Sequence, residues 1–209
     1  MVELFPSKEP TSTKQKILET AIDLFSVNGY SAVSVREITK HVGIKESAMY
    51  NHFKTKDEIL DTIFDLFRNI QKRALPPIDK LEAILAVQSP QDFLAQGFEN
   101  FRRTVEDPVL VKLWRILNIE QYRDARARQI IRQEVYVGTI AFLEEAFRLM
   151  VDKGRIKPLE PRMLAFEYQY PIFSIMTEYL LLKIDDQDTT DLDELVKAHI
   201  QTFTQQVTT

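Results

Sequence analysis

Residues 34–53 read SVREITKHVGIKESAMYNHF, and this stretch decides the fold of the N-terminal part of the chain. Ser34 followed three residues later by Glu37 is the pattern of a capping box, which predicts a short helix over about residues 35–41. A three-residue turn with glycine at its centre follows, and a second short helix is expected over residues 45–51. Two short helices joined by such a turn have the geometry of a helix-turn-helix, whose second helix enters the major groove of DNA.

Helical periodicity continues on both sides of this motif. Before it, apolar residues recur at i, i+4, i+7 and i+8 from Ile17 to Phe25, and Gly29 then stands where a helix would end. After it, Thr55 and Glu58 form a second capping box ahead of a long apolar stripe. The N-terminal region is therefore expected to be a three-helix domain that leads into a longer helix.

The remainder of the chain is also expected to be helical. A proline directly after a capping residue, at Ser89-Pro90 and at Asp107-Pro108, marks two further helix starts. Longer helices are expected over about residues 124–153, 162–184 and 191–206. Only five glycines occur, and no alternating segment of five or more residues indicates a strand. The sequence therefore predicts an all-α fold of about nine helices.

Composition excludes several classes of protein. With 209 residues, 44% of them hydrophobic and 28% charged, the chain can build a core, which excludes wholesale disorder. No apolar run approaches the roughly 18 residues that span a bilayer, and residues 1–10 have no apolar stretch that would form a signal peptide. The absence of cysteine excludes disulfides, thiolate catalysis and cysteine zinc sites, and the three histidines are too scattered to predict a metal site. A cytoplasmic protein with no membrane partner and no cofactor is expected.

The formal net charge of −4 looks unfavourable for a protein that binds nucleic acid. The charge is unevenly distributed, however. Residues 1–56 carry eight basic and six acidic residues, whereas residues 57–209 carry nineteen and twenty-five. Within residues 34–56, five basic residues accompany two acidic ones. A mildly basic helix-turn-helix on an acidic remainder is compatible with DNA binding, and its modest positive charge predicts weak non-specific binding.

Residues 17–60 also carry a resemblance to a known family. The matching residues are ILETA at 17–21, LF at 24–25, GY at 29–30, VSVREI at 33–38 and GIKESAMYNHFKTKDEIL at 43–60. On these residues the chain resembles the TetR family of helix-turn-helix transcriptional regulators. The resemblance implies a DNA-binding domain over residues 1–56 and a helical effector-binding and dimerisation domain over residues 57–209. The second region fits the family only in length and helix content.

The resemblance assigns DNA contacts to matching residues of the helix-turn-helix. The implied DNA-binding set is Arg36, Lys45, Glu46, Ser47, Ala48, Tyr50, Asn51, His52 and Lys56. Ser47 can bond a base edge or a phosphate, and Ala48 suits a thymine methyl group. Tyr50 and His52 match positions that bond phosphate, and Lys56 opens a helix whose free N–H groups favour an anion.

Two residues depart from the family pattern. Lys45 stands where the family often has serine, and because lysine cannot cap a helix, the following helix is expected to fray before DNA binds. Glu46 is unusual at a groove-facing position. Its carboxylate could accept from a cytosine amino group, or it could point along the surface into solvent. The apolar residues of this region, which are interpreted as core, are Phe25, Ile38, Val42, Met49 and Phe53.

The resemblance further implies an effector cavity among the middle helices. The candidate lining residues are Phe64, Phe67, Phe93, Phe101, Trp114, Leu117, Tyr136 and Ile140. An aromatic stripe of this kind is also typical of plain core. Gly97 and Gly138 lie inside expected helices, where glycine is unfavourable by about 1 kcal/mol, so each indicates a close helix crossing or space for a ligand. Four arginines, at positions 123, 126, 128 and 132, could attract an anionic effector or form a solvated face.

The last two helices are implied to form a four-helix dimer interface. Residues 164–182 are apolar nearly all round, and such a helix must be buried on more than one side. The candidate interface residues are Ile172, Ile175, Met176, Tyr179, Val196, His199, Ile200 and Phe203. His199 fits an interface or core position better than a ligand site. A twofold dimer presents its reading helices one DNA turn, or a multiple, apart, which predicts a pseudo-palindromic operator.

These observations favour a homodimeric transcriptional repressor that binds a double-stranded DNA operator and is released from it by a small-molecule effector. A second hypothesis is a helix-turn-helix scaffold that acts through protein partners, or as an architectural DNA-binding dimer without a ligand. A third is an enzyme. Nothing in the sequence supports the enzyme, since it contains no nucleophile with a base, no phosphate-binding glycine loop and no metal-ligand spacing.

Overall fold

The computed structural model describes residues 12–208, apart from the side chains of residues 73, 74, 104 and 105. Residues 1–11, where no signal peptide is expected, lie outside this part. The described segment folds into helices and turns with no strand, which confirms the all-α prediction. None of its helices is both long and apolar enough to cross a membrane.

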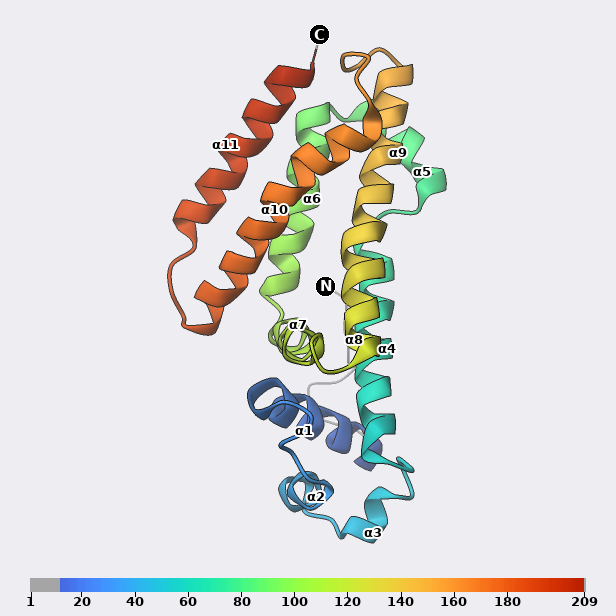
Figure 1. The fold of residues 1–209 in the computed structure, drawn as a ribbon, viewed down its shortest axis with the longest axis vertical. Helices are drawn as coiled ribbons and strands as arrows, with labels where there is room; N and C mark the ends of the chain where they lie inside the picture. Colours follow the sequence, from blue (N-terminus) through green and yellow to red (C-terminus); the bar gives the residue numbers. More distant parts are fainter. Residues whose placement is uncertain (1–11, 209) are drawn as a thin grey trace. The chain divides into compact units, whose positions relative to one another are not determined.

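The chain divides into two compact units, and the first contains the helix-turn-helix. This unit combines the described residues up to Ile70 with Pro108–Ile131. Its helices are α1 (Thr13–Asn28), α2 (Val35–Val42), α3 (Glu46–Met49), most of α4 (Lys56–Ala74), α7 (Pro108–Glu120) and α8 (Ala125–Ile130) (Figure 1). Because α7 packs along α1, the unit is larger than the DNA-binding domain expected over residues 1–56.

The core of this unit contains the residues that the sequence predicts for it. Phe25, Ile38, Met49 and Phe53 are at most 1% exposed, and Val42 is half-buried. Burial of the three large side chains that α1, α2 and α3 contribute fixes these helices against one another, because α2 and α3 are too short to be stable alone.

Local signals start and stop the helices of the unit as predicted. The hydroxyl oxygen of Ser34 accepts the N–H of Glu37 at 3.1 Å, as a capping box requires. Gly29 ends α1 and Gly43 ends α2, with φ angles of 77° and 78°. A Cβ atom at Gly29 would also lie 3.3 Å from Oε1 of Glu120. Backbone conformation and close packing therefore both require glycine at position 29.

The second unit combines Gln71–Asp107 with the described residues from Arg132 onward. Its helices are α5 (Ile78–Val87), α6 (Pro90–Val105), α9 (Gly138–Asp152), α10 (Pro161–Ile184) and α11 (Thr190–Val207). Figure 1 shows α10 between α9 and α11, and α11 also packs on α6. The rings of Phe147, Tyr168 and Phe203 meet where these helices cross, with centroids 5.3 to 6.4 Å apart.

One long helix runs through residues 125–152, which confirms the helix expected over 124–153. It consists of α8, a π-helical segment η1 (Ile131–Val137) and α9, with helical backbone at both junctions. If this helix is counted once, residues 12–208 form ten helices, and the one that the sequence analysis did not delimit is α5. Its start after Pro77 has no side-chain cap, so no capping residue marks it in the sequence.

The two helix-interior glycines do not lie at helix crossings. A Cβ atom at Gly138 would lie 3.3 Å from the carbonyl oxygen of Gln133, within the π-helical turn. Gly97 is exposed, and a Cβ atom there would meet nothing within 4 Å. The expected helix crossings are therefore wrong. Glycine at 138 relieves crowding inside the wider π-helical turn.

Candidate nucleic-acid interface

The turn between α2 and α3 is held by a compact set of backbone hydrogen bonds. The N–H groups of Gly43 and Ile44 both donate to the carbonyl oxygen of Thr39, each at 3.0 Å. The buried hydroxyl of Thr39 in turn donates to the carbonyl oxygen of Arg36 at 3.1 Å. The left-handed conformation of Gly43 makes this turn possible, so α3 leaves α2 in one defined direction.

Helix α3 is a single turn and shorter than the expected helix over residues 45–51. Lys45 precedes it in an extended conformation and makes no side-chain cap bond, which confirms that lysine does not cap here. Beyond α3, the N–H groups of His52 and Phe53 donate to the carbonyl oxygen of Met49 at 2.9 and 3.0 Å. Because Phe53 is drawn into the core, the chain leaves the helical path early. Residues 46–53, which we call the reading segment, are therefore one helical turn followed by a hydrogen-bonded turn.

Polar side chains of α2, α3 and the following turn remain free at the surface. Within residues 12–208, no hydrogen bond or ion pair engages the side chains of Arg36, Lys45, Glu46, Ser47, Tyr50, Asn51 and His52. Tyr50 is 51% exposed, whereas the adjacent Met49 is buried. Ala48, the remaining expected contact of the reading segment, is half-buried and apolar. Polar groups that have no partner inside the protein are available to a partner outside it.

Most of the positive charge of this region is also at the surface. Four of the five basic residues between positions 34 and 56 are exposed, and these are Arg36, Lys40, Lys45 and Lys54. Exposed lysine and arginine can neutralise phosphates and release the counterions of DNA, which supplies the sequence-independent part of binding. The region is thus equipped to hold a phosphate backbone.

Lys56 departs from its expected role as a phosphate contact. Its ammonium group donates to the carbonyl oxygens of Tyr30 at 2.8 Å and Val33 at 2.6 Å, and it lies 4.0 Å from the centre of the Tyr30 ring. Burial lowers the pKa of Lys56 below its ordinary value. In the free chain the Lys56 ammonium group is thus engaged inside the first unit. Lys56 ties the start of α4 to the α1–α2 turn, because its ammonium group donates to two carbonyl groups of that turn.

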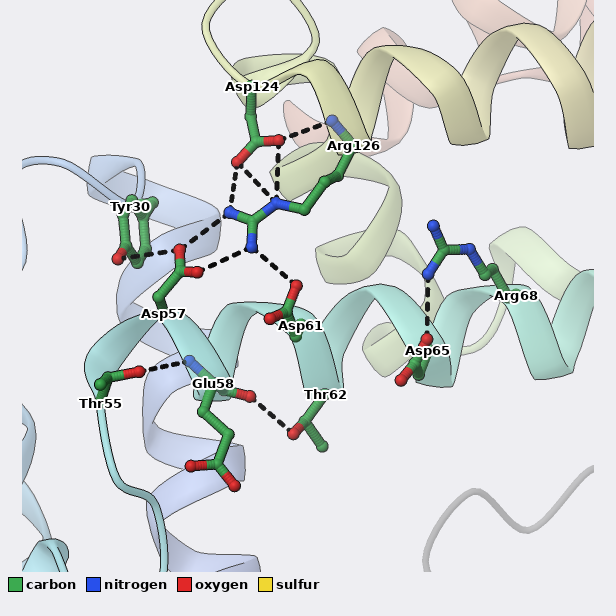
Figure 2. Close-up of polar contacts among 10 residues, drawn as sticks. All are labelled: Tyr30, Thr55, Asp57, Glu58, Asp61, Thr62, Asp65, Arg68, Asp124 and Arg126. Atoms are coloured by element: carbon green, nitrogen blue, oxygen red, sulfur yellow. Dashed lines mark hydrogen bonds and ion pairs between the residues drawn. The ribbon is translucent and has the colours of Figure 1, made fainter.

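The first turn of α4 is capped by its own side chains. The hydroxyl oxygen of Thr55 accepts the N–H of Glu58 at 3.0 Å, as Figure 2 shows. The Glu58 carboxylate reaches back and accepts the N–H of Lys54 at 2.6 Å. The Thr55 half of the predicted capping box is confirmed, whereas Glu58 bonds the N–H of the residue before the cap. The Thr55 bond also means that the N–H of Glu58 is not free for a phosphate.

Sequence reasoning missed a cluster of charges around Arg126, at the start of α8. Figure 2 shows its guanidinium group among Asp57, Asp61 and Asp124, with N–O distances of 2.6 to 2.8 Å. Hydrogen bonds from Arg126 hold the pKa values of Asp57 and Asp124 below the ordinary value. Arg126 is therefore neither on a solvated face nor free for an anionic effector. The i, i+4 spacing of Asp57 and Asp61 was the only signal of this cluster in the sequence.

A buried carboxylate holds the end of α1. Glu120, at the end of α7, is 2% exposed and accepts the N–H of Tyr30 at 2.8 Å. The Tyr30 hydroxyl donates to Asp57 at 3.4 Å. Burial, together with the Asp57 carboxylate, raises the pKa of Tyr30. No local pattern marks Glu120, because its partner is ninety residues away in the chain.

The candidate effector residues fall into both units. Phe64, Phe67 and Leu117 are buried in the first unit, where the ring of Trp114 packs edge-on against Phe67 at 5.0 Å. The other four belong to the second unit: Phe93 and Ile140 are buried, Phe101 is half-buried, and Tyr136 is 43% exposed. The buried members serve as core in their own units.

Two of the candidate effector residues line a surface hollow in the second unit. The hollow has a volume of about 220 Å³ and lies between the η1–α9 segment and α10. Its lining residues are Tyr136, Val137, Ile140, Ala141, Glu144, Arg162, Phe166 and Tyr170. The aromatic walls are largely exposed, and the charged groups Glu144 and Arg162 pair with each other at 3.5 Å.

Most residues expected at the dimer interface are buried within the chain itself. The buried ones are Ile172, Ile175, Tyr179, Val196, Ile200 and Phe203, whereas Met176 and His199 are half-buried. His199 stacks on the Tyr168 ring, and its Nε2 atom lies 2.9 Å from the Tyr168 carbonyl oxygen. The large apolar side chains that α10 and α11 leave exposed are Met163, Tyr170, Leu181, Ile184 and Leu195.

Comparison with known proteins places these features in context. Residues 17–63 match the family model described as bacterial regulatory proteins, tetR family. The HTH-type transcriptional repressor KstR2 of Mycolicibacterium smegmatis is 30% identical over 84 residues, which are 36% of this chain and 41% of that protein. The HTH-type transcriptional regulator AcrR of Shigella flexneri is 29% identical over 141 residues, which are 68% of this chain and 58% of that protein. The chain thus matches about half the length of these relatives.

The likeness extends to the fold of the whole chain. The structure of SmeT in complex with triclosan has a TM-score of 0.66 and 19% sequence identity, and the match covers 94% of this chain and 92% of that one. At this identity the superposition shows a shared fold. The helices that follow the helix-turn-helix therefore share their arrangement with a solved structure although their sequence has diverged.

Proposed function

Since this chain belongs, through residues 17–63, to the tetR family of bacterial regulatory proteins, we propose that it is a homodimeric, effector-controlled repressor of transcription. In this proposal the dimer binds a pseudo-palindromic operator in double-stranded DNA and leaves it when a small molecule binds. One observation carries the DNA-binding part. A set of polar side chains on α2, α3 and the following turn is folded at the surface without any partner among residues 12–208.

The chemistry of these side chains assigns them different roles at DNA. Ser47 and Asn51 carry groups that can both donate and accept, so they suit base edges in the major groove. Ala48 offers a methyl surface to thymine. Tyr50 and His52 suit phosphate oxygens, which fix the position of the protein on the duplex. Arg36 and Lys45 add positive charge, and Glu46 is left to accept from cytosine or to face solvent.

Selection of DNA tests this function. A random duplex library selected on the dimer at moderate salt is expected to yield one consensus with two inverted half-sites. Because basic residues contact phosphate, binding to the selected duplex should weaken steeply with added salt. Selection that yields no consensus would favour the scaffold hypothesis instead, in which the helix-turn-helix serves protein partners or non-specific DNA binding.

Repression and effector release rest on the relatives. KstR2 is named a repressor, and SmeT has been solved in complex with triclosan. An effector that moves occupancy from 99:1 to 1:99 must favour the released form by about 5.5 kcal/mol. We place the effector in the hollow beside Tyr136, because its exposed aromatic side chains and its size suit a small amphipathic molecule. A compound that releases operator DNA should act about tenfold less well on Tyr136→Ala, and equally well on Tyr122→Ala, an exposed tyrosine elsewhere.

We propose that exposed residues of α10 and α11 form the dimer face, in place of the buried residues that the sequence analysis expected there. Met163 and Leu181 lie on the solvent side of α10, and Leu195 lies on that of α11. Large apolar side chains gathered on a surface favour contact with another protein surface. A second copy would cover these residues while the buried ones hold each protomer together.

Leu181→Glu is expected to convert the dimer into a monomer in solution. The side chain is 59% exposed in one chain, so the substitution leaves the core intact, whereas in the dimer it would bury an unpaired carboxylate twice. The molar mass from light scattering should halve at micromolar protein. Val87→Glu, at a residue 84% exposed on α5, is the matched control and should remain dimeric. A dimer that persists in Leu181→Glu would place the interface elsewhere.

A further inference from the structure

Arg126 uses nearly all its donors to hold carboxylates of α4 and of the N-cap of its own helix. Its Nη1 and Nη2 atoms donate to the two oxygens of Asp57, both at 2.8 Å. Nη1 also donates to Asp61 at 2.7 Å, and Nη2 donates to Asp124 at 2.6 Å (Figure 2). The guanidinium group lies 5.7 Å from the centre of the Phe64 ring as well. Bidentate pairing of this kind fixes geometry as well as supplying energy.

Two of the carboxylates that Arg126 holds, Asp57 and Asp61, stand in the first turns of α4, directly after the DNA-binding segment. Asp57 is the second residue of α4, and its carboxylate also accepts the Tyr30 hydroxyl. Lys56, the residue before it, bonds the carbonyl oxygens of the α1–α2 turn. Arg126 therefore closes a network that sets where α4 begins, and thereby where the preceding residues Tyr50 to His52 are held.

The network is unbalanced without Arg126. Three carboxylates surround a single guanidinium group, and Asp57 and Asp61 both bond its Nη1 atom. Removal of the guanidinium group would leave like charges close together on the first turns of α4, where they repel one another. This repulsion displaces the start of α4 and so acts against DNA binding, although Arg126 lies seventy residues beyond the helix-turn-helix in sequence.

We propose that Arg126 is a positioning residue for DNA recognition, which holds the start of α4 for the helix-turn-helix without touching DNA. The inference rests on the proposed function, since operator binding is the activity that it concerns. It adds a residue that neither the family resemblance nor the helix-turn-helix pattern points to.

The experiment compares Arg126→Ala with Arg128→Ala on the operator selected by the wild-type protein. Both substitutions remove one positive charge from α8, but Arg128 donates only to the carbonyl oxygen of Gln121. At a temperature where circular dichroism shows both variants folded, Arg126→Ala should bind at least tenfold more weakly, and Arg128→Ala within twofold of wild type. The dependence of affinity on salt should have the same slope in all three proteins, because Arg126 contacts no phosphate.

Two further variants separate positioning from general stabilisation. Arg126→Lys keeps the charge but loses the bidentate geometry, so it should recover part of the affinity. If Arg126→Ala is too unstable to assay, the triple variant D57N/D61N/R126Q removes the charge imbalance and keeps groups that can hydrogen-bond. The triple variant should fold and bind the operator measurably, but more weakly than the wild-type protein.

The outcomes distinguish this inference from the function on which it rests. If the wild-type protein selects no operator, the proposed function has failed. If it does, but folded Arg126→Ala, or the triple variant in its place, binds that operator as tightly as wild type, only the inference is overturned. A shallower salt slope in Arg126→Ala would also overturn it, since it would make Arg126 a direct phosphate contact.

The acid dependence of stability gives a second measure of the network. Hydrogen bonds from Arg126 keep the pKa of Asp57 and Asp124 below the ordinary value in the folded protein. Their stabilising contribution is thus fully present above the unfolded value near 4, and it is lost as pH falls through the lower folded value. The groups that face them are Arg126, Asp61 and the Tyr30 hydroxyl. The Tm difference between wild type and Arg126→Ala should be constant above about pH 5 and should shrink toward pH 3. A difference that stays unchanged to pH 3 would mean that these carboxylates do not hold Arg126.

Discussion

The double variant Tyr50→Ala/His52→Ala is expected to bind the selected operator about a hundred- to a thousandfold more weakly than the wild-type protein. Each side chain is free in the folded chain and is proposed to bond a phosphate oxygen. A dimer would therefore lose four hydrogen bonds of about 1 kcal/mol each, and every 1.4 kcal/mol is a factor of ten in affinity. Fluorescence anisotropy of a labelled operator measures the change.

Stability should be nearly unaffected by the same double variant. Tyr50 is 51% exposed, and neither side chain has a polar partner within residues 12–208. The matched control is Tyr122→Ala, which removes a tyrosine that is 85% exposed in the same unit and should leave both affinity and Tm unchanged. A folded double variant with an affinity within twofold of wild type would show that this surface does not contact DNA.

Lys56→Ala is expected to have the opposite pattern, with a large loss of stability and no change in the salt slope of operator binding. The ammonium group donates to two backbone carbonyl groups of the α1–α2 turn. Two charge-assisted hydrogen bonds are lost in the variant, and the Tyr30 carbonyl keeps only the longer bond from the N–H of Val33 at 3.4 Å. We expect the free energy of unfolding to fall by about 2–3 kcal/mol. Chemical denaturation measures this loss.

Lys54→Ala is the matched control for Lys56→Ala. Its side chain is exposed two residues earlier in the chain, so its removal should leave stability unchanged while reducing the salt slope of binding. The family resemblance alone predicts the reverse assignment, with Lys56 at the phosphate. A Lys56→Ala variant that is as stable as wild type and has a reduced salt slope would restore that assignment.

What the sequence predicts well are features determined by neighbours along the chain. Ser34 with Glu37 and Thr55 with Glu58 form their capping bonds as expected, and Gly29 ends α1 with a positive φ angle. Each of these depends on residues within one helical turn. The core residues of the helix-turn-helix also follow from helical spacing, because a buried face repeats at a fixed period.

What the sequence does not predict depends on partners far along the chain. Arg126 and Glu120 meet residues more than sixty positions away, and no periodicity connects them. The place of Lys56 at a helix start predicts a surface contact with phosphate. In the fold, however, two backbone carbonyl groups lie within reach of its ammonium group and accept hydrogen bonds from it. For the dimer face, hydrophobic spacing identifies a buried side of α10 and α11. Three-dimensional packing decides whether the same chain or a second copy covers that side. Here the helices of the same chain cover it.

The central claim is that a dimer places its two helix-turn-helix motifs together on one operator. A hydroxyl-radical footprint of the wild-type protein on its selected operator tests this claim most directly. Two reading segments in successive major grooves should protect two short stretches, centred about 10 base pairs or a multiple of that apart and related by inversion. Tyr50→Ala/His52→Ala should abolish both stretches together. A single protected stretch, or uniform weak protection without any spacing, would contradict the account.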